Sequence, residues 1–91
     1  LQDLAAMGFK SVICNRPDGE ASDQPAFPLI EAAAKAAGLE AAYLPVTPGS
    51  ITDIDVEQFD ALLKELPTPI LAYCRSGSRS TSLYNLAQQL P

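Results

Sequence analysis

Residues 70–81 read ILAYCRSGSRST, and this stretch decides the fold more than any other part of the chain. Its apolar first half is typical of a buried strand that stops at Cys74. A loop rich in serine and glycine follows, and Arg79 then opens a helical segment. A strand, a tight loop and a helix N-terminus in this order can place a thiol beside converging backbone amides. The stretch therefore predicts an α/β fold with a reactive cysteine at a strand end.

Cys74 is the candidate nucleophile. The thiolate, not the thiol, attacks, and a helix N-terminus and nearby arginines favour the thiolate. Arg79 is placed to grip an anion through two parallel hydrogen bonds, and Arg75 is a second candidate for steering one. We expect the loop residues between them to bind the same anion: Ser76, Gly77 and Ser78. Ser80 either hydrogen-bonds the sulfur or caps the helix. The alternative is a buried, inert cysteine followed by a solvated turn.

Helices and strands alternate on either side of this stretch. Apolar runs predict strands at 9–14, 40–46 and 69–73. Apolar spacing, with glycine, proline or Thr52 at the ends, predicts four helices, over 1–7, 28–37, 52–66 and 79–89. This order predicts a three-layer α/β fold, with a mostly parallel sheet flanked by helices. Ligands bind such sheets at the carboxyl ends of the strands, where Cys74 lies.

Composition limits the classes of protein that the chain can represent. Its 91 residues form a single small domain, and 47% hydrophobic residues can build a core. The net charge of −5 disfavours nucleic acid or an anionic membrane as a partner. No apolar run approaches the ~20 residues of a membrane span, so we expect a cytoplasmic protein. Three strands are few for a free-standing sheet, so we expect 1–91 to be incomplete at one or both ends or part of a longer chain.

The titratable residues narrow the chemistry further. The chain has two cysteines, far apart in sequence, and no histidine. These counts exclude a histidine-assisted cysteine or serine hydrolase and the common zinc sites that contain histidine. We therefore expect no metal and no cofactor in this domain.

Acidic residues offer accessory candidates. Asp18, together with Arg16, is expected at the strand ends facing the Cys74 loop, although a plain Asp-Gly turn is the alternative. Asp53 and Asp55 could be proposed as a general acid, but their spacing after Thr52 favours a helix cap.

The loop from Cys74 to Ser80 resembles the active loop of rhodaneses and of cysteine-dependent phosphatases. Phosphatases place five residues between the cysteine and the arginine, whereas rhodaneses place four, in a smaller ring that fits a persulfide. This chain has four, and it has Tyr73 where tyrosine phosphatases have histidine. Both departures favour transfer of sulfur over hydrolysis of a phosphate ester.

Matching segments along nearly the whole chain resemble the phosphatase-like domain of beta-lactamase hydrolase-like proteins. They include residues 8–13 (GFKSVI), 16–20 (RPDGE), 31–34, 37–39, 45–47 and 51–53. The resemblance implies a dual-specificity-phosphatase-like (phosphotyrosine phosphatase II-like) fold with a rhodanese-length loop. That family is bacterial and is often fused to a persulfide dioxygenase or a flavoprotein oxidoreductase. It implies that the first strand lies beside the strand ending at Cys74.

Cys14 departs from the asparagine that this family more often has at its position. It could act as a resolving thiol for Cys74, but a buried, inert cysteine is favoured.

Three functions stay open for the domain. The favoured one is a sulfurtransferase that forms a Cys74 persulfide from thiosulfate or a small persulfide. The others are a phosphatase acting through a Cys74 phosphocysteine and a non-catalytic anion-binding module.

Overall fold

The predicted alternation of helices and strands is present in the computed structural model, which describes residues 2–47, 49–74 and 77–90. The elements of this part of the chain are α1 (Gln2–Ala6), β1 (Ser11–Cys14), α2 (Phe27–Ala36), β2 (Glu40–Tyr43), α3 (Asp53–Glu65), β3 (Ile70–Tyr73) and α4 (Ser78–Ala87). The strands form one parallel sheet in the order β2-β1-β3. The predicted α/β fold is therefore confirmed, including the position of the first strand beside the strand that precedes Cys74.

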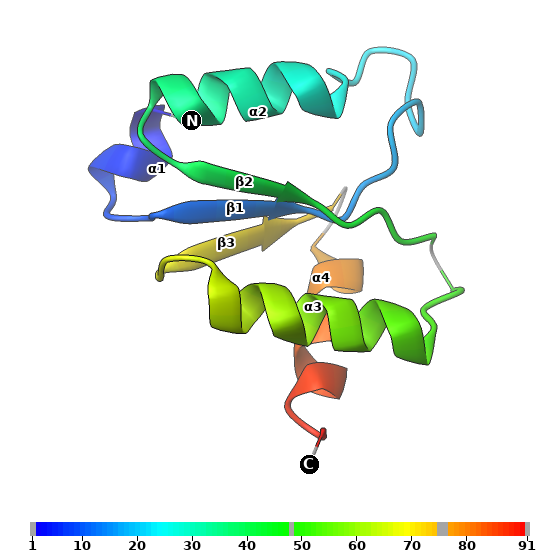
Figure 1. Cartoon of the computed structure of the whole chain (residues 1–91). Helices are drawn as coiled ribbons and strands as arrows, with labels where there is room; N and C mark the ends of the chain where they lie inside the picture. The colour runs from blue at the N-terminus through cyan, green and yellow to red at the C-terminus, as the bar shows by residue number, and fades with distance from the viewer. Residues whose placement is uncertain (1, 48, 75–76, 91) are drawn as a thin grey trace.

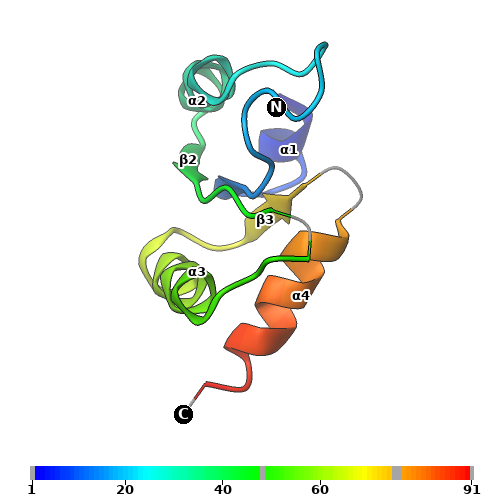
Figure 2. The same ribbon diagram turned by 90° about the vertical axis from the view of Figure 1, so that its right-hand side faces the viewer.

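The sheet lies between two layers of helices. Helices α1 and α2 cover one face, and α3 and α4 cover the other (Figure 1 and Figure 2). Central strand β1 is buried along its whole length, because it has a neighbouring strand on each side and helices above and below. A strand buried on both faces reads as a continuous apolar run, which is why residues 12–14 lack the alternation of a half-exposed strand. The buried Ser11 hydroxyl donates to the Pro67 carbonyl at 2.8 Å.

Neighbouring residues of β1 supply the two halves of the core. Val12 packs with Ala34 and Leu39 on the α1 and α2 side. Ile13 points to the other face, where it joins a larger cluster: Leu44, Val46, Val56, Phe59, Leu83 and Ala87. Burying one large apolar side chain contributes about 2–3 kcal/mol. This second cluster fixes α3 and α4 on the sheet, and α4 is the helix that follows the Cys74 loop.

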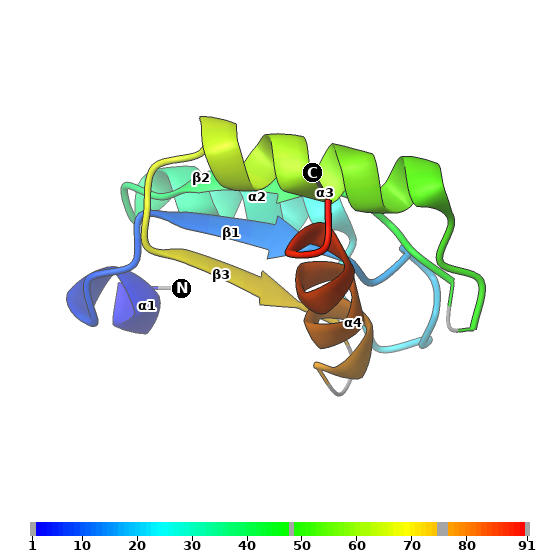
Figure 3. The same ribbon diagram turned by 90° about the horizontal axis from the view of Figure 1, so that it is seen from below.

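The carboxyl ends of the three strands meet at one edge. Cys14 pairs with Tyr43 on one side and with Tyr73 on the other. The Asn15 N–H donates to the Tyr73 carbonyl at 2.8 Å, so the residue after β1 lies beside the end of β3. The strand arrows in Figure 1 point to this edge, and Figure 3, seen from below, shows α3 and α4 on the near face of the sheet. Cys74 is thus placed where α/β sheets bind ligands.

Several predicted boundaries differ from the observed ones by one to three residues, and two of them bear on the site. The second strand was expected to reach residue 46 but ends at Tyr43. The chain still follows β1 beyond that point, because the N–H groups of Leu44 and Val46 donate to carbonyls of residues 14 and 15. The last helix begins at Ser78 rather than at Arg79, because Gly77 adopts a left-handed φ of 87° as its N-cap.

The acidic residues after Thr52 form a helix cap, as predicted. The Thr52 hydroxyl accepts from the Asp55 N–H at 3.1 Å, and the Asp55 carboxylate accepts from the Thr52 N–H at 3.0 Å. This reciprocal capping box satisfies two backbone donors of α3. Asp53 lies in the same first turn. Within residues 2–47, 49–74 and 77–90, no helix combines the length and the apolar character needed to cross a membrane.

Candidate active site

Cys74 is the first residue after β3, and its side chain is half-buried. The N–H of Gly77, the N-cap of α4, donates to the Cys74 sulfur at 3.1 Å. This bond directs the N-terminal end of α4 toward the sulfur, where its positive partial charge stabilises an anion. The left-handed φ of Gly77 makes this approach possible, since a side chain would strain that backbone.

The other predicted loop residues are only partly described. Arg75 and Ser76, both predicted to bind an anion, lie outside the described residues. Ser78 is the first residue of α4 and is exposed. One inward-facing amide is therefore established, from Gly77, and it is the geometry that an anion-stabilising loop requires.

Arg79 is only 8% exposed, although it carries a charge in the first turn of a helix. Its Nη1 donates to Glu20 Oε2 and its Nη2 donates to Glu20 Oε1, both at 2.7 Å. Nη1 also donates to the Val46 carbonyl at 3.0 Å. The guanidinium is thus held between the segment that follows β1 and the segment that follows β2.

Glu20 links two arginines. Its Oε1 also accepts from Arg16 Nε at 3.2 Å. The hydrogen bond from Arg79, and next the one from Arg16, lower the pKa of Glu20 below its ordinary value of 4.5. The same bond raises the pKa of Arg79, and the neighbouring Cys74 sulfur raises it further to a smaller extent. The pair is therefore ionised at neutral pH, next to the candidate nucleophile.

Sequence reasoning missed Glu20, since it singled out Asp18 from the same turn. The structure places the Asp18 carboxylate elsewhere, because it accepts from the Phe27 N–H at the start of α2, at 2.8 Å. The Asp18 N–H donates to the Tyr43 hydroxyl at 2.8 Å. Asp18 thus fastens the turn to α2, whereas Arg16 is linked to Arg79 through Glu20. A buried arginine needs a carboxylate, but the burial of Arg79 comes from the fold, so the sequence held no local signal that favoured Glu20 over Asp18.

We expect the stability difference between the wild type and Glu20→Gln to depend on pH. The fold lowers the pKa of Glu20, so the ion pair stabilises the folded state above pH 4.5 and loses its contribution as the pH falls through the lowered pKa. Urea midpoints of the two proteins should differ at neutral pH and converge in acid. A difference that stays constant throughout the acid range would contradict this account.

Ser80 connects α4 to the end of β1. Its hydroxyl donates to Asn15 Oδ1 at 2.8 Å, and Asn15 Nδ2 donates to the Leu44 carbonyl at 2.9 Å. Asn15 is fully buried, so these bonds satisfy a side chain that would otherwise be costly to bury. Of the two alternatives considered for Ser80, the helix cap is wrong, because the N-cap is Gly77. Its role is to position α4, and with it Arg79, on the sheet.

Cys14 is buried, at 4% exposure, and its thiol donates to the Arg16 carbonyl at 3.3 Å. Burial raises the pKa of the Tyr73 hydroxyl, and contact with Cys14 raises it further. Tyr73 therefore keeps its proton at neutral pH. This environment resembles that of a structural cysteine, which is the favoured interpretation of Cys14.

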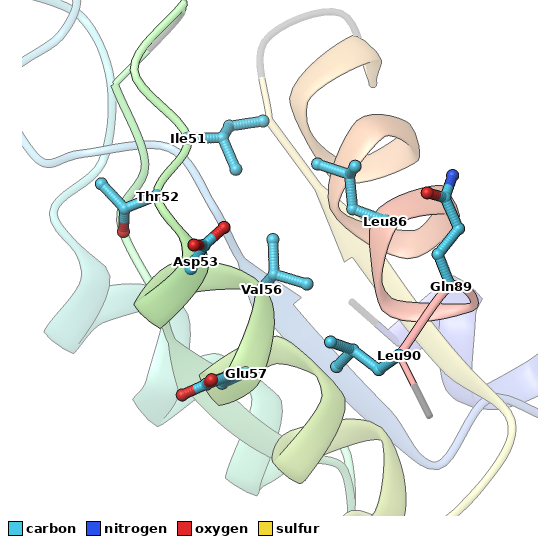
Figure 4. A pocket seen from close by; sticks show the side chains of 8 residues that line it. All are labelled: Ile51, Thr52, Asp53, Val56, Glu57, Leu86, Gln89 and Leu90. Carbon is cyan, nitrogen blue, oxygen red and sulfur yellow. The ribbon is translucent and has the colours of Figure 1, made fainter.

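A shallow opening beside Arg79 is lined by Gly49, Ile51, Ser78, Arg79 and Ser82. A separate groove lies between the start of α3 and the end of α4 (Figure 4). The side chains that Figure 4 labels there include Ile51, Val56, Leu86 and Leu90, but neither Cys74 nor Arg79. Of these two openings, only the one at Arg79 is lined by predicted site residues, Ser78 and Arg79. Among the described residues, no group of three or more side chains could hold a metal ion.

The model of one protein family, the phosphatase-like domain of beta-lactamase hydrolase-like proteins, matches residues 1–91. The chain belongs to this family. A beta-lactamase hydrolase-like protein of Agrobacterium fabrum is 40% identical over 87 residues, which is 96% of this chain. One of Xylella fastidiosa is 37% identical over 86 residues, or 94% of this chain. The chain spans about one fifth of the length of these curated relatives, since the match covers 20% of each.

Solved structures confirm the phosphatase-like fold. A candidate phosphatase from Neisseria meningitidis superposes with a TM-score of 0.87 at 38% sequence identity, over 99% of this chain and 66% of that chain. Another, from Shewanella putrefaciens, gives a TM-score of 0.79 at 26% identity, over 96% of this chain and 54% of that chain. This domain is thus a phosphatase-like α/β domain whose loop carries Cys74 and Arg79 with four residues between them.

Proposed function

We propose that this domain is a sulfurtransferase that carries sulfur as a Cys74 persulfide. The observation that carries the proposal is the Gly77 N–H, which donates to the Cys74 sulfur itself at 3.1 Å. A donor at this distance stabilises negative charge on sulfur before and after the transfer. The four-residue spacing between Cys74 and Arg79 supports the same function, because the ring is shorter than the one that surrounds a phosphate.

The reaction has two steps. The Cys74 thiolate attacks the outer sulfur of thiosulfate, the sulfur–sulfur bond of thiosulfate breaks, and sulfite leaves with the bonding electron pair. An acceptor nucleophile such as cyanide then attacks the outer sulfur of the persulfide. Thiocyanate forms, and the Cys74 thiolate is regenerated. Because the enzyme is modified between two substrates, ping-pong kinetics are expected.

The carboxylates near the site favour sulfur transfer over phosphate ester hydrolysis. Hydrolysis of a phosphate ester gains from a general acid that protonates the leaving alkoxide. The Asp18 carboxylate accepts from the Phe27 N–H, that of Glu20 from Arg79, and that of Asp55 from the Thr52 N–H, while Asp53 lines the groove between α3 and α4. Sulfite is a stable anion and leaves without being protonated. The positions of these carboxylates therefore fit a sulfur donor better.

A cysteine-dependent phosphatase is the second candidate. It is favoured by the family and by the similarity to candidate phosphatases, with a TM-score of 0.87. In that case Cys74 would attack phosphorus and form a phosphocysteine, which water would hydrolyse.

We further propose a cellular setting in bacterial sulfide and persulfide metabolism, in the cytoplasm. A persulfide dioxygenase or a flavoprotein oxidoreductase, fused or associated, would consume or supply the sulfur. The relatives leave room for such a domain, since four fifths of their length lies outside the match.

Product analysis separates the candidates. The purified protein is incubated with thiosulfate and cyanide, and separately with an aryl phosphate, and thiocyanate and phosphate are measured. We expect thiocyanate, and mass spectrometry after thiosulfate alone should show one added sulfur atom on Cys74. Phosphate release with a phosphorylated Cys74 and no thiocyanate would establish the phosphatase instead. Neither product and no modification of Cys74 would indicate a non-catalytic anion-binding module.

A further inference from the structure

The guanidinium of Arg79 has two edges that could bind an oxyanion, and Glu20 occupies one of them. A guanidinium carries five N–H groups in a fixed planar fork. Its outer edge, formed by Nη1 and Nη2, donates to both oxygens of Glu20 at 2.7 Å. The second N–H of Nη1 donates to the Val46 carbonyl. The side edge, with the Nε–H and the second N–H of Nη2, is directed away from Glu20, and a hydrogen bond with the Cys74 side chain contributes to the raised pKa of Arg79.

We propose that Glu20 is a positioning residue, which holds Arg79 so that the side edge of its guanidinium presents two parallel N–H groups to an anion in front of Cys74. The proposal rests on the proposed function only for the identity of that anion. The shared chemistry is an oxyanion group, such as the sulfonate end of thiosulfate, gripped bidentately.

The contacts around Glu20 fit such a role. Its carboxylate also accepts a hydrogen bond from Arg16, which holds Glu20 in the segment after β1. The Val46 carbonyl, in the segment after β2, accepts a third hydrogen bond from Arg79 and further restrains the guanidinium. Arg79 lies two residues after Gly77, whose amide contacts the sulfur. The influence of Cys74 on the pKa of Arg79 indicates that the guanidinium and the sulfur are neighbours.

A purely electrostatic role for Glu20 predicts the opposite effect. If the carboxylate only offset the charge of Arg79, its removal would make the site more positive and improve anion capture. If it positions Arg79, its removal lets the fork turn away, and anion capture weakens. The direction of change therefore distinguishes the two roles.

The experiment compares alkylation of Cys74 by iodoacetate, an anion, and by iodoacetamide, a neutral reagent of similar size. The same thiolate attacks the CH₂ carbon of both reagents and iodide leaves in both cases, so the ratio of their rates reports on anion capture. Glu20→Gln keeps the size of the side chain but sets an amide N–H₂ against the guanidinium. We expect it to lower the ratio about 10-fold, the size of effect typical of residues that orient a binding group. Alkylation is read at Cys74 by mass spectrometry.

Two further variants make the result decisive. Asp60→Asn breaks the Asp60–Lys64 ion pair on α3, whose contact distance is 2.9 Å. Like Arg16 and Glu20, these two residues are four positions apart, but they lie outside the Cys74 loop. It should leave the ratio unchanged. Arg16→Gln removes only one hydrogen bond to Glu20, so it should lower the ratio less than Glu20→Gln does. If Glu20→Gln does not fold, the ratio measured for Arg16→Gln decides whether Glu20 positions Arg79.

A ratio that stays the same or rises in Glu20→Gln, or in Arg16→Gln if that variant must decide, overturns the proposal. The steady-state kinetics of sulfur transfer give a second readout, because misplacing Arg79 should raise KM for thiosulfate more than it lowers kcat. If the wild type forms no thiocyanate, the proposed function fails, but the alkylation ratio still tests the role of Glu20.

Discussion

Replacing Cys74 with serine should remove sulfur transfer almost completely, with a loss of about 10⁴-fold or more in kcat. A serine hydroxyl is not ionised at neutral pH, and an oxygen in this position cannot form a persulfide. The Gly77 amide, which lies 3.1 Å from the sulfur, would then face a neutral hydroxyl. The measurement is thiocyanate formation from thiosulfate and cyanide, with urea midpoints to show that the variant is folded.

The matched control is Cys14→Ser. Cys14 is buried, and its thiol donates to the Arg16 carbonyl at 3.3 Å, a bond that a serine hydroxyl can also make. We expect turnover to stay at the wild-type level. If the two variants lost activity equally, Cys14 would be a resolving thiol that takes part in the reaction. If Cys74→Ser stayed active, the assignment of the nucleophile would be wrong.

The second large effect is expected for Arg79→Lys, which should lower kcat/KM for thiosulfate about 100-fold. Lysine keeps the positive charge but has one ammonium group in place of a planar fork. It cannot meet both oxygens of Glu20, the Val46 carbonyl and an anion together, whereas Arg79 has donors on separate edges for these partners. Steady-state kinetics with thiosulfate as the varied substrate measure the change.

Arg16→Lys is the comparison for this variant. Arg16 makes its hydrogen bond to Glu20 through Nε and is more exposed than Arg79. A lysine there should change kcat/KM far less, because the remaining bonds of Glu20 come from Arg79 itself. Similar losses in the two variants would mean that charge near the site matters, rather than the fork of Arg79.

Much of the architecture could be predicted because its signals are local. The apolar run before Cys74, the glycine at Gly77 and the spacing from Thr52 to Asp55 each act within one or two turns of chain. They correctly predicted β3, the start of α4 within one residue, and the capping box of α3. Alternation of such segments leaves few topologies, and the parallel order β2-β1-β3 is one of them.

The partners of the site side chains could not be predicted in the same way. Glu20 and Arg79 are 59 residues apart, and Asn15 and Ser80 are 65 apart. Both Asp18 and Glu20 stand in one short turn, and nothing in the local pattern says which carboxylate points to Arg79. The backbone of that turn directs Asp18 to the Phe27 amide and leaves Glu20 for the arginine.

The sequence by itself determined the α/β class, the strand that ends at Cys74 and the four-residue spacing to Arg79, because periodicity and spacing are properties of the chain. Only the tertiary structure decided that Glu20 and Val46 accept hydrogen bonds from Arg79 and that Asn15 accepts one from Ser80. The reason is physical: a buried charge or amide must be satisfied by whatever group the packed segments bring within hydrogen-bond distance.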